Sequence, residues 1–106
     1  IQVNMDGGEN KSGVAPHDAL ALAQAVSVLP RLQLRGIMSI PEPDDNPQRM
    51  QALHDHTRAL LQRLQQALPQ LTLDALSMGM SADLEPAIAA GSTWVRVGTA
   101  IFGSRT

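Results

Sequence analysis

The chain has 106 residues and a formal net charge of −2, from eight basic and ten acidic residues, and 43% of it is hydrophobic. This length allows one small domain, and with one Trp, one Phe and no Tyr its core must be aliphatic. The mixed charge argues against a nucleic-acid or anionic-membrane surface, which needs a concentrated basic patch. The lack of cysteine excludes disulfides and cysteine-ligated metal, and no apolar run reaches the roughly 20 residues of a membrane span. These features are compatible with a cytoplasmic location.

The first third of the chain predicts a strand, a loop, a helix and a second strand. Apolar and polar side chains alternate over residues 1–5, as in a strand, and glycines and polar residues crowd the loop of residues 6–13. A helix then begins after Asp18, which is placed to cap it, and ends at the next proline. Residues 32–40 form the second predicted strand, in which Gly36 indicates a close backbone approach or a bend.

The strongest periodic pattern follows residues 41–47, a loop that three prolines keep out of helix. After it, mostly apolar residues recur at helical spacing, and most charged residues lie off this stripe. The stripe consists of Met50, Leu53, Thr57, Leu60, Leu61, Leu64 and Leu68. It predicts a long amphipathic helix that ends before Pro69.

Two further strands and a short helix complete the chain. Residues 71–77 and 93–97 have strand patterns, and between them Ser81 can cap a short helix that stops at Gly91. Strands that alternate with helices predict a parallel sheet with helices on one face. The cores of the four expected strands are residues 1–5, 34–39, 73–77 and 93–97. The fold class is therefore α/β, either half of a (β/α)8 barrel or a small open doubly wound sheet.

The ends of the chain favour the half-barrel. The sequence starts inside a strand without an initiating Met, and the two outer strands of a lone half would be unpaired edges. We therefore expect residues 1–106 to be half of a single barrel domain. This half alone should expose a large apolar patch, and should dimerise or require the other half, whereas the full-length protein should be a monomer.

Polar loops follow the third and fourth strands. In parallel α/β folds the ligand lies at the carboxyl ends of the strands. Gly79 and Gly98 would let backbone N–H groups approach an anion, Ser81 and Thr99 offer hydroxyl donors, and the helix that starts near Ala82 points its positive end the same way. The two loops together predict a phosphate site. The alternative is that the glycines serve turns and the hydroxyls serve as helix caps.

Arg96 lies near the end of the fourth strand. Alternation places it on the same face as Trp94, and a buried guanidinium needs an acceptor because an unpaired buried charge is expensive. That acceptor is either a carboxylate on a neighbouring strand or an atom of the ligand.

Other candidate residues have simpler interpretations. His54 and His56 are two positions apart and diverge on a helix, so we expect no shared metal. Met78 and Met80 flank Gly79 and either fill the core or pack around the ligand.

These segments carry a family resemblance. The stretches QVN…ENKSG, LRGIMSIP and LSMGMSADLEPAIAAGSTWVRVGTAIFGSR resemble the C-terminal half of the pyridoxal-phosphate homeostasis protein (YggS-like) family over nearly all 106 residues. The resemblance implies a (β/α)8 TIM-type barrel like that of alanine racemase, which is fold type III of pyridoxal 5′-phosphate (PLP) proteins. It also implies a PLP binder linked to vitamin B6 and amino-acid homeostasis, without established turnover.

The resemblance also implies roles for particular residues. The cofactor-binding positions are Ser77, Met80, Ser81, Arg96, Gly98 and Thr99, with the phosphate on the loops and Arg96 facing the pyridine nitrogen. An arginine there keeps the ring nitrogen unprotonated and the ring a weak electron sink, which suits a carrier. The Schiff-base lysine is expected in the missing N-terminal half, because Lys11, the only lysine here, is expected to be solvated in a polar loop.

Two alternative functions would use the same phosphate corner, the two loops that contain Ser81 and Thr99. One is a racemase-like PLP enzyme and the other is a phosphosugar-binding TIM barrel. A racemase needs a second acid/base residue, normally a tyrosine from a further domain, and this chain has no tyrosine and ends at Thr106. The carrier is therefore the favoured reading.

Overall fold

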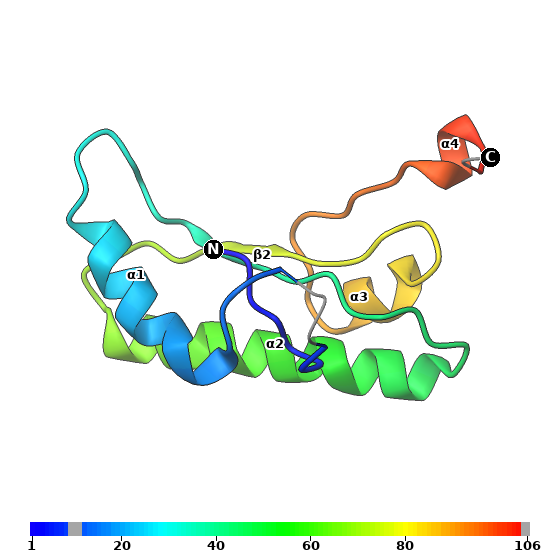
Figure 1. Ribbon diagram of the computed structural model, residues 1–106, viewed down its shortest axis with the longest axis horizontal. Coiled ribbons are helices and arrows are strands. Elements are labelled where there is room, and N and C mark those ends of the chain that lie inside the picture. The colour runs from blue at the N-terminus through cyan, green and yellow to red at the C-terminus, as the bar shows by residue number, and fades with distance from the viewer. Residues whose placement is uncertain (9–11, 105–106) are drawn as a thin grey trace.

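The structure is a computed structural model that describes residues 1–8 and 12–104. Two short strands run through its middle, a long helix lies along one side of them, and the C-terminal helix stands away from the rest (Figure 1). In chain order the elements are η1 (Pro16–Asp18), α1 (Ala19–Ser27), β1 (Gly36–Met38), α2 (Pro47–Ala67), β2 (Ala75–Ser77), α3 (Leu84–Ala89) and α4 (Thr99–Phe102). Strands therefore alternate with helices in an α/β arrangement, as the sequence predicts.

The sheet has β1 and β2 as parallel neighbours, with Ile37 opposite Leu76. The first and fourth predicted strands do not form regular strands within the described chain. They make single parallel bridges instead, between Gln2 and Met38 on one side and between Ser77 and Trp94 on the other. Every pairing among the four segments is parallel.

The outer segments stay short because other groups take their ladder hydrogen bonds. After its bridge to β1, the N-terminal segment turns to pair with Val14, which accepts from the N–H of Asn4 at 2.8 Å. On the other side Thr93 Oγ1 accepts from the N–H of Leu76 at 2.7 Å. Ser92 Oγ donates to the carbonyl of Met78 at 2.7 Å. Hydroxyl side chains can replace backbone partners in this way, so the fourth segment is attached without a long ladder.

Gly36 allows the two strands to approach closely. A Cβ placed on Gly36 would overlap the carbonyl oxygen of Ala75 on the neighbouring strand. The close approach predicted from this glycine is thereby confirmed. Just before each strand, Arg35 Nε donates to Asp74 Oδ1 at 2.7 Å, and these hydrogen bonds hold the pKa of Asp74 below its ordinary value. The ion pair joins the two strands at their entry.

The long helix α2 begins earlier than its apolar stripe. Asn46 caps it by accepting from the N–H groups of Gln48 and Arg49, and Pro47 is its first residue. The prediction that residues 41–47 all stay outside the helix is wrong at this one position, because proline suits the first turn, where its missing N–H needs no partner.

The first helix, α1, is shorter than predicted and is not capped as expected. Asp18 occupies its N-cap position but makes no side-chain cap hydrogen bond. The short helix η1 precedes it, and its helical backbone runs directly into α1. Ala19 and Ala23 form the buried side of α1.

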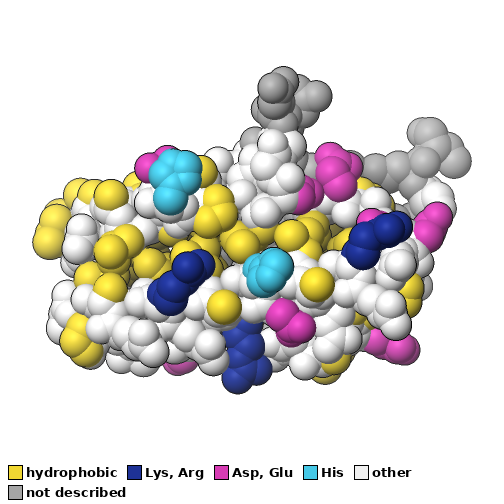
Figure 2. All heavy atoms as spheres, turned by 90° about the horizontal axis from the view of Figure 1, so that it is seen from below, with side chains coloured by type: hydrophobic (Ala, Val, Ile, Leu, Met, Phe, Trp, Pro, Cys, Tyr) yellow, Lys and Arg dark blue, Asp and Glu magenta, His cyan; other side chains and the backbone are white. Residues whose placement is uncertain are grey.

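The core lies between α2 and the strands. Its buried side chains are Val3, Ala19, Ile37, Leu60, Leu61, Leu64, Leu73, Leu76, Met78, Ala87 and Ala90. Most of the predicted stripe of α2 is buried as expected, and α3 packs on α2. On the face shown in Figure 2, basic and acidic side chains are interspersed. Within residues 1–8 and 12–104, no helix has the length and apolar character that crossing a membrane requires.

Candidate functional site

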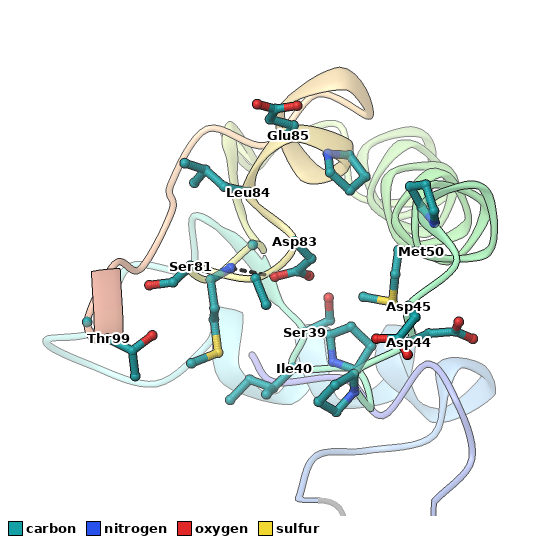
Figure 3. A pocket seen from close by; sticks show the side chains of 18 of the residues that line it. Ser39, Ile40, Asp44, Asp45, Met50, Ser81, Asp83, Leu84, Glu85 and Thr99 are labelled. Carbon is teal, nitrogen blue, oxygen red and sulfur yellow. Dashed lines mark hydrogen bonds between the residues drawn. The ribbon is translucent and has the colours of Figure 1, made fainter. Parts of the chain in front are cut away.

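A pocket of about 1170 Å³ lies at the carboxyl ends of the strands. Three segments line it: the residues from the end of β1 to the start of α2, the loop between β2 and α3 with the first residues of α3, and Gly98 with α4 and the residues after it. Figure 3 shows Ser81 and Thr99 on one side and Asp44 and Asp45 with Met50 on the other. The pocket thus has a hydroxyl side and an acidic side.

The two loops singled out from the sequence lie next to each other. Their strand segments are joined by the Ser77–Trp94 bridge, and Ser81 Oγ accepts from the N–H of Ala100 at 3.1 Å. The sequence suggested Ser81 as the cap of α3, but the N-cap position is occupied by Asp83. Ser81 instead connects its loop to the first turn of α4. The hydroxyl side of the pocket is therefore built by both loops.

Most of the predicted phosphate residues line this pocket. Met80, Ser81, Gly98 and Thr99 contribute to its wall, as does Gly79. Ser77 is not among the lining residues. Its carbonyl accepts from the N–H of Ser39 at 3.1 Å, which extends the pairing of β1 with β2.

The two glycines of these loops differ in what they require. Gly79 has φ +101°, and a Cβ there would lie 2.6 Å from the Cβ of Ala87, so conformation and packing both demand glycine. Gly98 has φ −121°, which any residue adopts, and nothing lies within 4 Å of its Cβ position. Packing in the described chain therefore does not explain Gly98.

One backbone N–H is not available to an anion. The sequence predicts that backbone N–H groups around residues 79–81 approach the phosphate. The N–H of Met80 instead donates to Asp83 Oδ1 at 2.8 Å, because a carboxylate three residues on competes for local donors. The expectation is wrong for Met80, although the exposed side chain of Met80 still lies at the pocket. Met78 is fully buried, in agreement with the core-filling interpretation.

Arg96 joins the ends of the strands. Its Nη2 donates to the carbonyl of Ser39 at 2.8 Å, and its own N–H donates to the carbonyl of Gly79 at 2.9 Å. Its Nε is buried and has no partner among the described residues. The carboxylate partner considered from the sequence is not found in the described chain, and Arg96 is not among the residues that line the pocket.

The acidic side of the pocket is partly neutralised. Arg49 Nε donates to Asp44 Oδ2 at 2.9 Å. This interaction and the N–H of Asn46 hold the pKa of Asp44 below its ordinary value. An anionic group is expected to bind at the hydroxyl side, away from these carboxylates.

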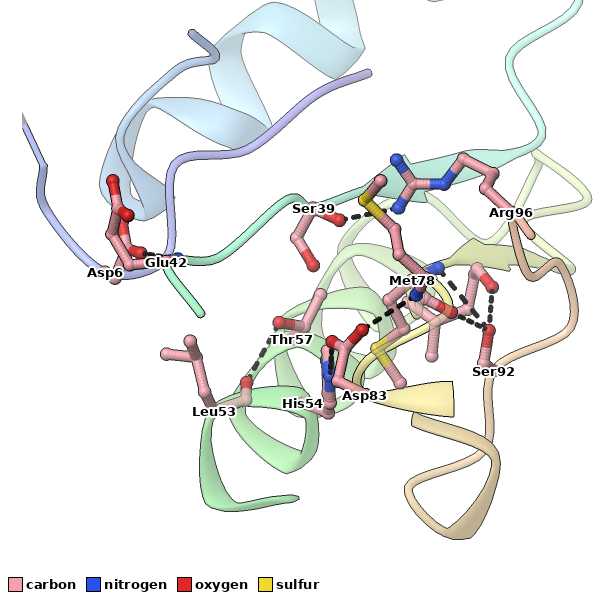
Figure 4. Close-up of polar contacts among 12 residues, drawn as sticks. Asp6, Ser39, Glu42, Leu53, His54, Thr57, Met78, Asp83, Ser92 and Arg96 are labelled. Carbon is pink, nitrogen blue, oxygen red and sulfur yellow. Dashed lines mark hydrogen bonds and ion pairs between the residues drawn. The ribbon is translucent and has the colours of Figure 1, made fainter. Parts of the chain in front are cut away.

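A contact between a buried histidine and a partly buried aspartate was missed from the sequence. His54 is fully buried on α2, and its Nε2 lies 2.8 Å from Asp83 Oδ2 (Figure 4). The signal was present, because position 54 lies four residues after Met50 and three before Thr57 on the buried stripe. His56 is exposed. Lys11, for which a solvated loop was predicted, lies outside the described residues.

Taken together, parallel strands that alternate with helices and a polar pocket at their carboxyl ends define an α/β protein with a pocket where such folds bind their ligands. The family follows from comparison with known proteins. The model of the family described as "Alanine racemase, N-terminal domain" matches residues 1–106. The chain belongs to this family.

The relatives of the chain share a common name. It is 53% identical over 105 residues to the pyridoxal phosphate homeostasis protein of Pseudomonas aeruginosa, covering 99% of this chain and 44% of that protein. It is 46% identical over 105 residues to the protein of the same name in Escherichia coli K12, with the same coverage. The chain thus spans less than half the length of these relatives.

Solved structures show the same fold. PipY of Synechococcus elongatus PCC7942 without PLP matches with a TM-score of 0.87 and 42% identity, over 97% of this chain and 48% of that one. PipY with PLP bound matches with a TM-score of 0.82 and 40% identity, over 95% of this chain and 47% of that one.

Proposed function

We propose that this chain supplies the phosphate-binding loops of a PLP-binding protein that acts in vitamin B6 and amino-acid homeostasis. The observation that carries the proposal is the meeting of the two polar loops at the Ser81–Ala100 contact, on one side of a strand-end pocket. A relative with 40% identity, PipY, binds PLP in its solved structure, and the curated relatives are named for PLP homeostasis.

The residues of this corner fit a phosphate ester. A phosphate oxygen accepts charge-assisted hydrogen bonds, which are stronger than neutral ones. The hydroxyls of Ser81 and Thr99 would donate to it, and Gly98 would let the backbone approach. Ser77 and Met80 would shape the loop. In this assignment the phosphate binds to the hydroxyl side and the ring extends toward Arg96.

Arg96 is assigned to the pyridine nitrogen. Its bond to the Ser39 carbonyl orients the guanidinium, and its buried Nε is a donor without a protein acceptor in the described chain. A guanidinium stays protonated at ordinary pH, so it donates to the ring nitrogen and leaves that nitrogen without a proton. PLP supplies an aldehyde for amine chemistry, and a ring held in this way is a weak electron sink. This favours a binder or carrier over a racemase.

We further propose that residues 1–106 form the C-terminal half of a (β/α)8 domain. The chain leaves large apolar side chains in water near its C-terminal end: Trp94 is 65% exposed, Ile101 68% and Phe102 85%. The N-terminal half of the same barrel is the partner that would cover them, and the protein containing both halves would be a monomer. The cytoplasmic location stays a prediction.

The isolated 106 residues should therefore not form a stable monomer. Exposed apolar surface and single-bridge strand edges favour self-association. Size-exclusion chromatography with light scattering should show dimers or larger species, and addition of the N-terminal half should return a single compact heterodimer. A cooperative monomer of 106 residues would contradict the half-barrel assignment.

The function is tested by the cofactor's spectrum. The native full-length protein should acquire an absorption band at about 420 nm on addition of PLP, because PLP attached to a protein amine absorbs in the visible. Borohydride reduction followed by peptide mapping should locate the attachment outside residues 1–106. A protein that remains colourless and binds no PLP would refute the proposal.

A further inference from the structure

We propose that His54 is a positioning residue for the phosphate-binding loop: it holds Asp83, and Asp83 in turn holds the N–H of Met80, so that Ser81 faces the start of α4. This inference rests on the proposed function, because it concerns the loop assigned to the PLP phosphate. His54 itself would not touch the ligand.

The contact between His54 and Asp83 is buried and directional. The side chain of His54 is 0% exposed and that of Asp83 13%. An ionised carboxylate only accepts hydrogen bonds, so Nε2 of His54 carries the donated proton. Its Nδ1 is buried without a partner in the described chain, and a second proton there would have no acceptor. With its hydrogen on Nε2, the imidazole donates to Asp83 and orients this carboxylate by hydrogen-bond geometry.

Asp83 connects this contact to the loop. Its Oδ1 accepts from the N–H of Met80 at 2.8 Å, and its own N–H donates to the carbonyl of Met80 at 3.2 Å. Its carbonyl accepts from the N–H of Ala87 at 3.1 Å, which begins α3. The Cβ of Ala87 also packs closely on Gly79, where it leaves no room for a side chain. The loop is thus held between α3 and a carboxylate whose second oxygen is bound by α2.

The consequence falls on Ser81, which follows Met80 directly. Ser81 Oγ uses an acceptor site on the Ala100 N–H, and its hydroxyl hydrogen remains available for a phosphate oxygen. A loop already fixed in this orientation loses little entropy when the ligand binds. Without His54, one oxygen of Asp83 would be released in a largely buried site, the turn would loosen, and the carboxylate would be free to approach the phosphate and repel it.

Another buried polar residue on the same helix provides a matched control. Thr57 is as buried as His54, but its Oγ1 donates to the carbonyl of Leu53, inside α2 itself, at 3.0 Å. Figure 4 shows this bond turned toward the helix, whereas the His54 ring meets Asp83. Replacing Thr57 with valine should alter packing in α2 without reaching the loop.

The test compares PLP with pyridoxal, which lacks the phosphate, in the native full-length protein. His54→Phe should reduce the ratio of PLP to pyridoxal affinity by on the order of tenfold, the effect of losing one hydrogen bond to a charged group. His54→Gln, whose amide can donate to Asp83, should restore most of the ratio. Thr57→Val should leave the ratio unchanged. An unchanged ratio in His54→Phe, or equal losses for both ligands, would overturn the inference.

A ligand-free measurement separates this inference from the proposed function. Hydrogen exchange at the Met80 amide should be faster in His54→Phe than in the wild type, and unaffected in Thr57→Val. If the wild type fails to bind PLP, the proposed function fails while this exchange still decides whether His54 holds the loop. If His54→Phe does not fold, three other variants replace it: Asp83→Ala, His54→Gln, and the double variant with both changes. The two changes should be non-additive in Met80 exchange, and additive effects would contradict the chain of contacts.

Discussion

Replacing Gly36 with alanine should prevent the native fold from forming. The new Cβ would overlap the carbonyl oxygen of Ala75 and lie only 2.6 Å from its carbonyl carbon. Both are backbone atoms of the neighbouring strand, so no side-chain movement relieves the overlap and β1 must separate from β2. Because Ile37 and Leu76 pair there within the core, we expect a loss of about 4 kcal/mol or more in the free energy of unfolding. Urea unfolding of the native full-length protein, followed by circular dichroism, should show a strongly lowered midpoint or no cooperative transition.

Gly98→Ala is the control for this stability measurement. It makes the same chemical change at a position with an ordinary φ and nothing within 4 Å of the added carbon. The free energy of unfolding should change by less than about 1 kcal/mol. Equal stability of Gly36→Ala and the wild type would mean that β1 and β2 are not as close as described.

Removing both hydroxyls of the phosphate corner should weaken PLP binding by about a hundredfold. Each hydroxyl would donate one hydrogen bond to a charged oxygen, and two such bonds together contribute roughly 3 kcal/mol. The double variant Ser81→Ala, Thr99→Val should therefore lose PLP affinity while its affinity for pyridoxal changes little. Equilibrium titration of both ligands with the native full-length protein, followed by absorption, measures the ratio.

The control removes the same two groups elsewhere. Ser27 ends α1 and donates to the carbonyl of Gln24, and Thr72 is exposed just before β2. Neither lines the pocket, so Ser27→Ala combined with Thr72→Val should leave both affinities near their wild-type values. Parallel losses of PLP and pyridoxal in the Ser81, Thr99 variant would show that the corner does not contact the phosphate.

Much of this protein follows from its sequence alone. Helical spacing located α2, and alternation with intervening helices predicted parallel neighbours. Gly36 marked the close approach of the strands. The polar residues after positions 77 and 97 predicted two loops at the same end of the sheet. These features depend on the periodicity and conformational limits of neighbouring residues, which are local properties. The quoted motifs also indicated the family.

The tertiary structure alone decided which polar groups meet. Asp83 binds His54, 29 positions earlier in the chain, and accepts from the Met80 N–H, which was predicted to approach an anion. Arg96 donates to the carbonyl of Ser39, 57 positions earlier in the chain, and not to a carboxylate. The hydroxyls of Ser92 and Thr93 bond to backbone groups next to β2 and take the place of ladder hydrogen bonds of a regular fourth strand. In each of these pairings a polar group had several possible donors or acceptors of similar chemistry. Which one it bonds to depends on which of them folding brings within hydrogen-bonding distance and removes from water.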